Sequence, residues 1–178
     1  SANDARLANL ERVDVSGRLL LPGYIDTQVN GGGGVLFNDA PTVESIRRIG
    51  AAHARFGTTG FLPTLISDDL DVVARAIRAV DAAIEAGVPG VLGIHVEGPF
   101  ISSAKRGVHD ARHFLALDDS AIALLTSLRR GRTLLTLAPE VAPPALLQRL
   151  ADAGVVLAAG HSNATATDVE IAREHGLR

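Results

Sequence analysis

Cysteine is absent from this 178-residue chain, as are methionine and tryptophan. Without cysteine the chain has no disulfide framework and no thiolate that could act as a nucleophile or bind a metal. Any metal ion would therefore be held by histidine, carboxylate, carbonyl or water. Aromatic residues make up only 3% of the chain, so the core must consist of Leu, Val, Ile and Ala, which suits parallel sheets covered by helices.

Strong charge bias and long apolar runs are also missing. The formal net charge is −3 and the isoelectric point is near 6.0, which excludes the basic surface typical of nucleic-acid binding. No apolar run approaches the roughly 18 residues that a membrane-spanning helix needs, and no signal peptide is recognisable. We therefore expect a cytoplasmic protein that binds neither nucleic acid nor membrane.

Strand and helix patterns alternate along the chain at a spacing of about 30 residues, which is typical of βαβ units and a parallel sheet. The predicted strands are 24–29, 58–65, 91–97, 134–137 and 155–159. The predicted helices are 43–56, 70–86, 119–129, 143–153 and 167–175, with Thr42 as an N-cap of the first.

Two architectures fit this alternation, an open doubly wound sheet and a (β/α)8 barrel. Polar residues gather where the predicted strands end: Asp26, Gln28, Asn30, Thr64, His95, Glu97, Glu140 and His161. A barrel brings all its strand ends to one shared mouth, whereas an open sheet spreads them along an edge. We therefore expect a TIM-type (β/α)8 barrel, of which this chain supplies about five of the eight units.

The strand at 91–97 carries the first candidate ligand. Side chains alternate along a strand, so His95 and Glu97 share one face, while Ile94 and Val96 share the face toward the helices. A buried carboxylate is costly unless it has a partner. A metal ion or polar ligand would satisfy Glu97, and an ion pair with an inward Lys or Arg is the alternative. His95 alone is interpreted as packing or as a neighbour of the ligands.

His161 follows the last predicted strand, between small residues that allow a ligand to approach closely. Its position matches that of Glu97 two units earlier, and imidazole with carboxylate is a combination that Zn²⁺ accepts in catalytic sites.

Two further loops are weaker signals. Gln28 and Asn30 precede four glycines, and Lys105 and Arg106 begin a basic loop that either binds a phosphate or is solvated surface.

Six stretches together resemble N-acetylglucosamine-6-phosphate deacetylases of the amidohydrolase superfamily. They are 22–26, 57–65, 95–100 (His-Val-Glu-Gly-Pro-Phe), 105–109 (Lys-Arg-Gly-Val-His), 136–140 and 160–165 (Gly-His-Ser-Asn-Ala-Thr). The resemblance implies metal-dependent hydrolysis of the acetamido group of N-acetylglucosamine 6-phosphate, which gives glucosamine 6-phosphate and acetate. It also implies a homodimer, because members of this family commonly dimerise.

By matched position, the resemblance makes Glu97 and His161 metal ligands, and Val108 and His109 contacts of the substrate. Many amidohydrolases hold a second metal with His-x-His after the first strand. Gln28 and Asn30 stand at those places here, so we expect one divalent ion. Zinc is preferred, with iron and manganese as alternatives, and Gln28, Asn30 and His95 are candidates for the residues around the ligands.

The resemblance also sets the expected domain organisation. Residues 1–18 would be a remnant of a small β-sandwich domain, and residues 19–178 the N-terminal part of the barrel. Another metal-binding His and the Asp that serves as general base would then lie beyond Arg178, so no catalytic base is assigned and the chain alone is not expected to deacetylate. The alternatives are an amidohydrolase for another N-acyl or cyclic amide, and an inactive metal- or sugar-phosphate-binding remnant.

Overall fold

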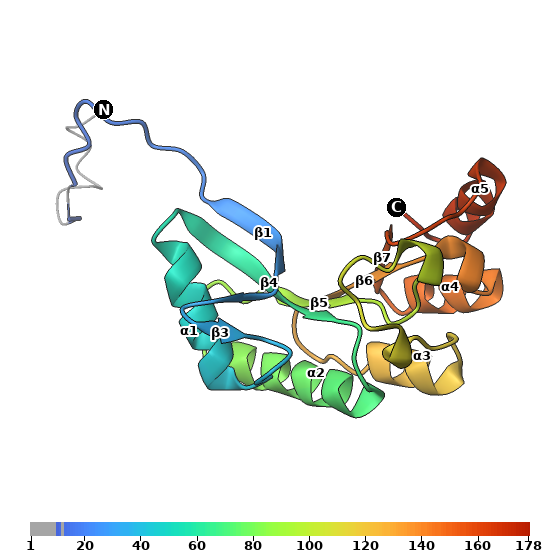
Figure 1. The fold of residues 1–178 in the computed structure, drawn as a ribbon. Helices are drawn as coiled ribbons and strands as arrows, with labels where there is room; N and C mark the ends of the chain where they lie inside the picture. Colours follow the sequence, from blue (N-terminus) through green and yellow to red (C-terminus); the bar gives the residue numbers. More distant parts are fainter. Residues whose placement is uncertain (1–9, 12) are drawn as a thin grey trace.

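The computed structural model describes residues 10, 11 and 13–178. Its main sheet has five parallel strands in the order β1-β4-β5-β6-β7, and a two-stranded hairpin, β2 with β3, follows β1 (Figure 1). The strands are β1 (Tyr24–Val29), β2 (Gly31–Gly32), β3 (Val35–Leu36), β4 (Thr58–Ile66), β5 (Gly93–Glu97), β6 (Arg132–Leu137) and β7 (Val156–Ala159). The helices are α1 (Val43–Ala54), α2 (Leu70–Glu85), α3 (Asp119–Leu125), α4 (Pro144–Asp152) and α5 (Ala166–Glu174).

All five predicted strand–helix units are present, with ends that differ by a few residues. Thr42 is the N-cap of α1 as predicted, and its side chain accepts a hydrogen bond from the Ser45 amide. The predicted helix 119–129 was too long, because α3 ends at Leu125. Beyond it, the amides of Arg129 and Arg130 donate to the buried Asp81 carboxylate of α2 instead of continuing the helix.

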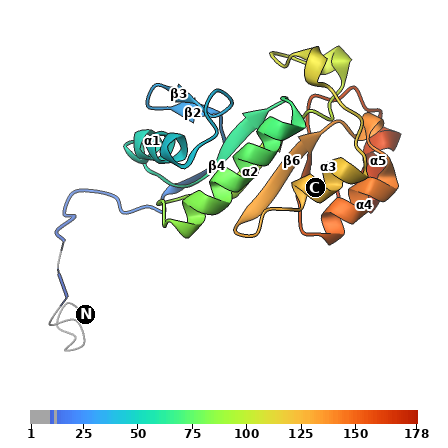
Figure 2. The same cartoon turned by 90° about the horizontal axis from the view of Figure 1, so that it is seen from below.

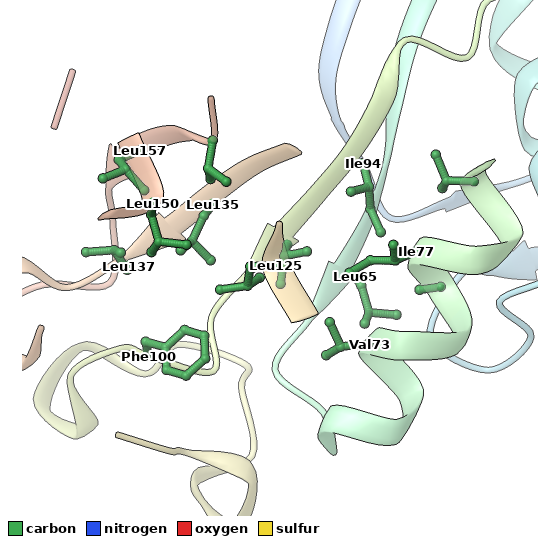
Figure 3. Packing of buried hydrophobic residues seen from close by; sticks show 14 of the residues in the cluster. Leu65, Val73, Ile77, Ile94, Phe100, Leu125, Leu135, Leu137, Leu150 and Leu157 are labelled. Carbon is green, nitrogen blue, oxygen red and sulfur yellow. The ribbon is translucent and has the colours of Figure 1, made fainter. Parts of the chain in front are cut away.

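Helices α2, α3 and α4 cover one side of the curved sheet, as Figures 1 and 2 show. Ile94 and Val96 of β5 belong to the hydrophobic core cluster on this side, as the strand alternation predicted. Figure 3 shows Ile94 near Leu65 of β4 and Ile77 of α2, while Leu135, Leu137 and Leu150 pack together further along the sheet. His95 and Glu97 alternate with these two residues along β5 and so point to the opposite side of the sheet.

The α/β class with a curled parallel sheet is confirmed. In the described part of the chain no further strand lies beyond β1 or β7, although Leu157 of β7 forms an isolated parallel bridge with Leu177. The five strands form an open arc, not a closed barrel. In the predicted domain 1–18, residues 10, 11 and 13–18 form no helix or strand, and the other residues of that segment lie outside the described ones. No helix among the described residues is long and apolar enough to cross a membrane.

Candidate metal and substrate site

Two strand ends and one loop bring three of the candidate residues together. Glu97 is the last residue of β5, His161 follows β7, and His109 lies in the loop between β5 and α3. Because β5 and β7 run parallel in one sheet, their carboxyl ends lie at the same edge. Nε2 of His161 lies 2.9 Å from Oε1 of Glu97, and Nε2 of His109 lies 3.9 Å from the same oxygen.

Glu97 is 7% exposed, and its partners are polar side chains of the site. The Gln28 side-chain amide donates to Oε2 at 2.9 Å, while Oε1 faces the two histidines. No ion pair of Glu97 with Lys or Arg occurs among the described residues, so the alternative of a structural ion pair with an inward Lys or Arg is not supported. The carboxylate is directed toward the imidazole rings of His109 and His161.

The ring of His161 has a defined hydrogen-bonding pattern. Its Nδ1 lies 2.9 Å from the backbone carbonyl of Lys105, and because a carbonyl can only accept, Nδ1 carries the hydrogen. In the neutral ring, Nε2 then presents a lone pair to a Glu97 oxygen 2.9 Å away. Two acceptors at this distance repel each other unless a proton or a metal ion lies between them. Metal-binding histidines usually donate their other ring hydrogen to a carbonyl or carboxylate in this way.

The donor set fits a divalent metal ion such as zinc. One ligand atom each from Glu97, His109 and His161 lies within 4.8 Å of the other two. Ligand atoms around tetrahedral zinc are about 3.3 Å apart, since each lies about 2.0 Å from the ion. Only small movements would therefore bring these atoms around one ion. Their spacing alone does not establish that His109 is a ligand.

The backbone of His161 is held in a rare conformation. Its φ of 51° makes it the one non-glycine residue with positive φ in the described part of the chain. Glu140 fixes the segment that follows, because it accepts hydrogen bonds from the Ser162 hydroxyl at 2.7 Å and the Asn163 amide at 2.6 Å. Burial alone would raise the pKa of Glu140, but these hydrogen bonds outweigh it and the pKa is lowered.

His109 is 2% exposed and contacts the residue that follows β4. Its Nδ1 lies 2.7 Å from the Ser67 hydroxyl and 3.3 Å from the Ser67 amide nitrogen. Burial, followed by the neighbouring His161, lowers the pKa of His109, and Glu97 opposes that shift. Val108, the other predicted substrate contact, is 87% exposed at the rim of the site.

The three residues predicted around the ligands, Gln28, Asn30 and His95, differ in their contacts. His95 is a satisfied interior histidine, with Nδ1 at 2.9 Å from the Thr27 carbonyl and Nε2 at 2.8 Å from the Thr136 hydroxyl. Burial lowers the pKa of His95, although Glu97 and the Thr27 carbonyl raise it. Asn30 lines the site, but its buried Nδ2 has no hydrogen-bond partner. Of the three, Gln28 alone donates a hydrogen bond to Glu97.

A cavity of about 460 Å³ opens in front of Glu97, His109 and His161. Its lining includes Leu36 of the glycine-rich hairpin but no lysine or arginine among the described residues. Of the two interpretations of the basic loop, a phosphate contact from Lys105 and Arg106 is therefore not seen at this cavity. Lys105 contributes its carbonyl to His161.

Sequence reasoning missed several residues of the cavity wall. Ser67, Asp68 and His113 line it, but they are separated from their partners in the site by tens of residues along the chain. The one available signal was the position of Ser67 two residues after the predicted strand 58–65, close to where barrel enzymes place functional side chains.

No family model matches the chain. Comparison with known proteins finds relatives that are named as deacetylases of amino-sugar phosphates. The N-acetylgalactosamine-6-phosphate deacetylase of Shewanella sp. (strain ANA-3) is 46% identical over 157 residues, which are 88% of this chain and 40% of that protein. The human N-acetylglucosamine-6-phosphate deacetylase is 37% identical over 164 residues, 85% of this chain and 39% of that protein. The chain thus spans about two fifths of the length of these relatives.

Solved structures agree with these relatives. The crystal structure of N-acetylglucosamine-6-phosphate deacetylase from Pasteurella multocida superimposes with a TM-score of 0.90 at 31% identity, over 96% of this chain and 45% of that one. The resemblance that the six sequence stretches indicated is confirmed. In both sequence and fold, this chain is similar to N-acetylglucosamine-6-phosphate deacetylases.

Proposed function

We propose that this chain provides the metal-binding part of an enzyme that hydrolyses the acetamido group of N-acetylglucosamine 6-phosphate, giving glucosamine 6-phosphate and acetate. One observation carries the proposal: Nε2 of His161 faces the Glu97 carboxylate at 2.9 Å while Nδ1 is engaged by the Lys105 carbonyl. This arrangement suits a cation between the two side chains. The named relatives supply the substrate class.

In this proposal Glu97 and His161 hold one divalent ion, with zinc preferred. Such an ion supplies a Lewis acid for the amide carbonyl and a water of lowered pKa. Gln28 orients the Glu97 carboxylate, and His109 and Val108 contact the substrate. The general base is not assigned to a residue of this chain. A closed TIM-type barrel, a homodimer and a cytoplasmic location belong to the same proposal.

A second candidate substrate is N-acetylgalactosamine 6-phosphate. The relative with 46% identity is named for this sugar, whereas the relatives named for the glucosamine compound are 31–37% identical. The two sugars differ only in the configuration at C4, so the same metal-assisted cleavage would serve both. Rates with the two sugar phosphates decide between them.

The test is a hybrid enzyme in which these residues replace the matched part of the Pasteurella deacetylase. We expect the folded hybrid to release acetate from one or both sugar phosphates only when a divalent metal is present. Glu97→Gln or His161→Ala should lower kcat/KM at least about a hundredfold, since a metal ligand is lost. His175→Ala, which changes a histidine outside the cavity, is the matched control and should keep the activity.

Three outcomes would count against the proposal. A hybrid that folds and binds metal but releases no acetate favours the inactive metal-binding remnant. Equal efficiency on unphosphorylated N-acetylglucosamine favours an amidohydrolase of different specificity. Full activity of Glu97→Gln and His161→Ala would refute the assignment of these two residues as metal ligands.

A further inference from the structure

His109 could serve the site in either of two ways. Its Nε2 lies near enough to Glu97 and His161 to be a third metal donor. Alternatively, Nε2 carries a hydrogen and donates to an oxygen of the substrate. A metal ligand must present a lone pair, and a hydrogen-bond donor must carry the hydrogen, so the position of one ring hydrogen separates the two roles.

The contacts of Nδ1 decide where that hydrogen lies. The backbone amide of Ser67 donates to Nδ1 at 3.3 Å, and an amide N–H cannot accept a hydrogen in return. Nδ1 therefore presents its lone pair to Ser67. The Ser67 hydroxyl, 2.7 Å from the same nitrogen, can donate to that lone pair as well. With Nδ1 occupied as an acceptor, the hydrogen of the neutral ring lies on Nε2.

The surroundings of Ser67 and His109 favour the contact between them. Ser67 is 6% exposed and His109 is 2% exposed, so water does not compete for these hydrogen bonds. Gly98, directly after Glu97, has a φ of +77°, and a Cβ added there would collide with the Ser67 hydroxyl and approach Nδ1 of His109. A glycine at this position thus allows the contact between Ser67 and His109.

The two histidines therefore present opposite groups to the same carboxylate. In His161 the carbonyl of Lys105 places the hydrogen on Nδ1 and leaves Nε2 as a lone pair. In His109 the amide of Ser67 places the hydrogen on Nε2. A centre that binds a metal and a substrate carbonyl can use one group of each kind, a lone pair for the metal and an N–H for the oxygen.

We propose that Ser67 is a positioning residue that fixes the His109 ring as an Nε2–H donor, the form that the substrate contact of His109 proposed above requires. This assignment rests on the proposed function for the identity of the substrate oxygen. The position of the ring hydrogen does not depend on that function, and it can be measured on the chain itself without substrate.

The experiment is a long-range ¹H–¹⁵N spectrum of the purified chain near pH 7.5, which reports the hydrogen position in each histidine ring. The chain has six histidines, and a His109→Gln spectrum identifies the signals of His109. We expect the Nε2–H form for His109 and the Nδ1–H form for His161. When zinc alone is added, the Nε2 signal of His161 should shift as expected for a coordinated nitrogen, while His109 keeps its Nε2–H pattern.

Two Ser67 variants test the role of the hydroxyl. Ser67→Ala keeps the amide but loses the hydroxyl, and the loss of one neutral hydrogen bond should raise the ratio of Nδ1–H to Nε2–H forms about fivefold. Ser67→Thr keeps the hydroxyl and should restore the wild-type pattern. A dispersed amide spectrum establishes that each variant is folded.

A coordinated Nε2 of His109 in the zinc complex, or an Nδ1–H form in the wild type, would overturn the proposal. A Ser67→Ala spectrum with an unchanged ratio would overturn the role given to the hydroxyl. If the chain binds no zinc, the proposed metal site fails, but the wild-type and Ser67 spectra still decide this inference.

Discussion

At the scale of single residues, hydrogen bonds from distant segments determine what each ring or carboxylate can do. Lys105 acts on His161 through its backbone carbonyl, and Ser67 acts on His109 through both its backbone amide and its hydroxyl. The backbone part of these roles is not revealed by side-chain type. Glu140 is another example, because its carboxylate holds the chain after His161. The lowered pKa of Glu140 gives this contact a measurable dependence on pH.

We expect Glu140→Gln to lower the free energy of unfolding at pH 7 by roughly 1.5–3 kcal/mol, the range for a hydrogen bond to a charged group. Because the folded pKa of Glu140 lies below the ordinary glutamate value of 4.5, the difference from wild type should be complete above pH 4.5. It should diminish as pH falls through the folded pKa. Urea unfolding of both proteins at several pH values measures it, and a difference that grows toward acid would contradict this account.

At the scale of secondary-structure elements, the chain is predictable where the pattern is local. Strand alternation placed Ile94 and Val96 in the core, and Thr42 was identified as an N-cap. The end of α3 was predicted wrongly, because Asp81 lies 48 positions before Arg129 and no local pattern announces their contact. The pairing of Ser67 with His109 was missed for the same reason, over 42 positions.

Asp81 should be important for stability because it is buried and binds the segment between α3 and β6. It accepts the amides of Arg129 and Arg130 and the Arg129 side chain. Asp81→Ala would leave these donors without their acceptor, and we expect a loss of about 1.5–3 kcal/mol in the free energy of unfolding, the range for hydrogen bonds to a charged group. Glu85→Ala is the matched control on α2, since its ion pair with Arg130 is exposed and should contribute under about 1 kcal/mol. Equal losses in urea unfolding would refute the role of Asp81.

At the scale of the whole molecule, five parallel strands bring Gln28, Glu97 and His161 to one edge although these residues lie far apart in the sequence. Counting strands predicted this arc correctly. A closed barrel is not determined by five strands, and the chain spans about two fifths of its named relatives. The gathering of these three residues at one edge was therefore predictable from motifs, whereas the closure of the sheet and the contacts to a phosphate were not.

Zinc affinity tests the central claim most directly, because the claim is that Glu97 and His161 share one metal ion. We would titrate the purified chain with zinc against a chelating indicator, beside Glu97→Gln, His161→Ala and the control His175→Ala. The account predicts one zinc per chain, an affinity lowered at least about a hundredfold in both site variants, and no change in the control. Equal affinity of all four proteins, or no binding by the wild type, would contradict it.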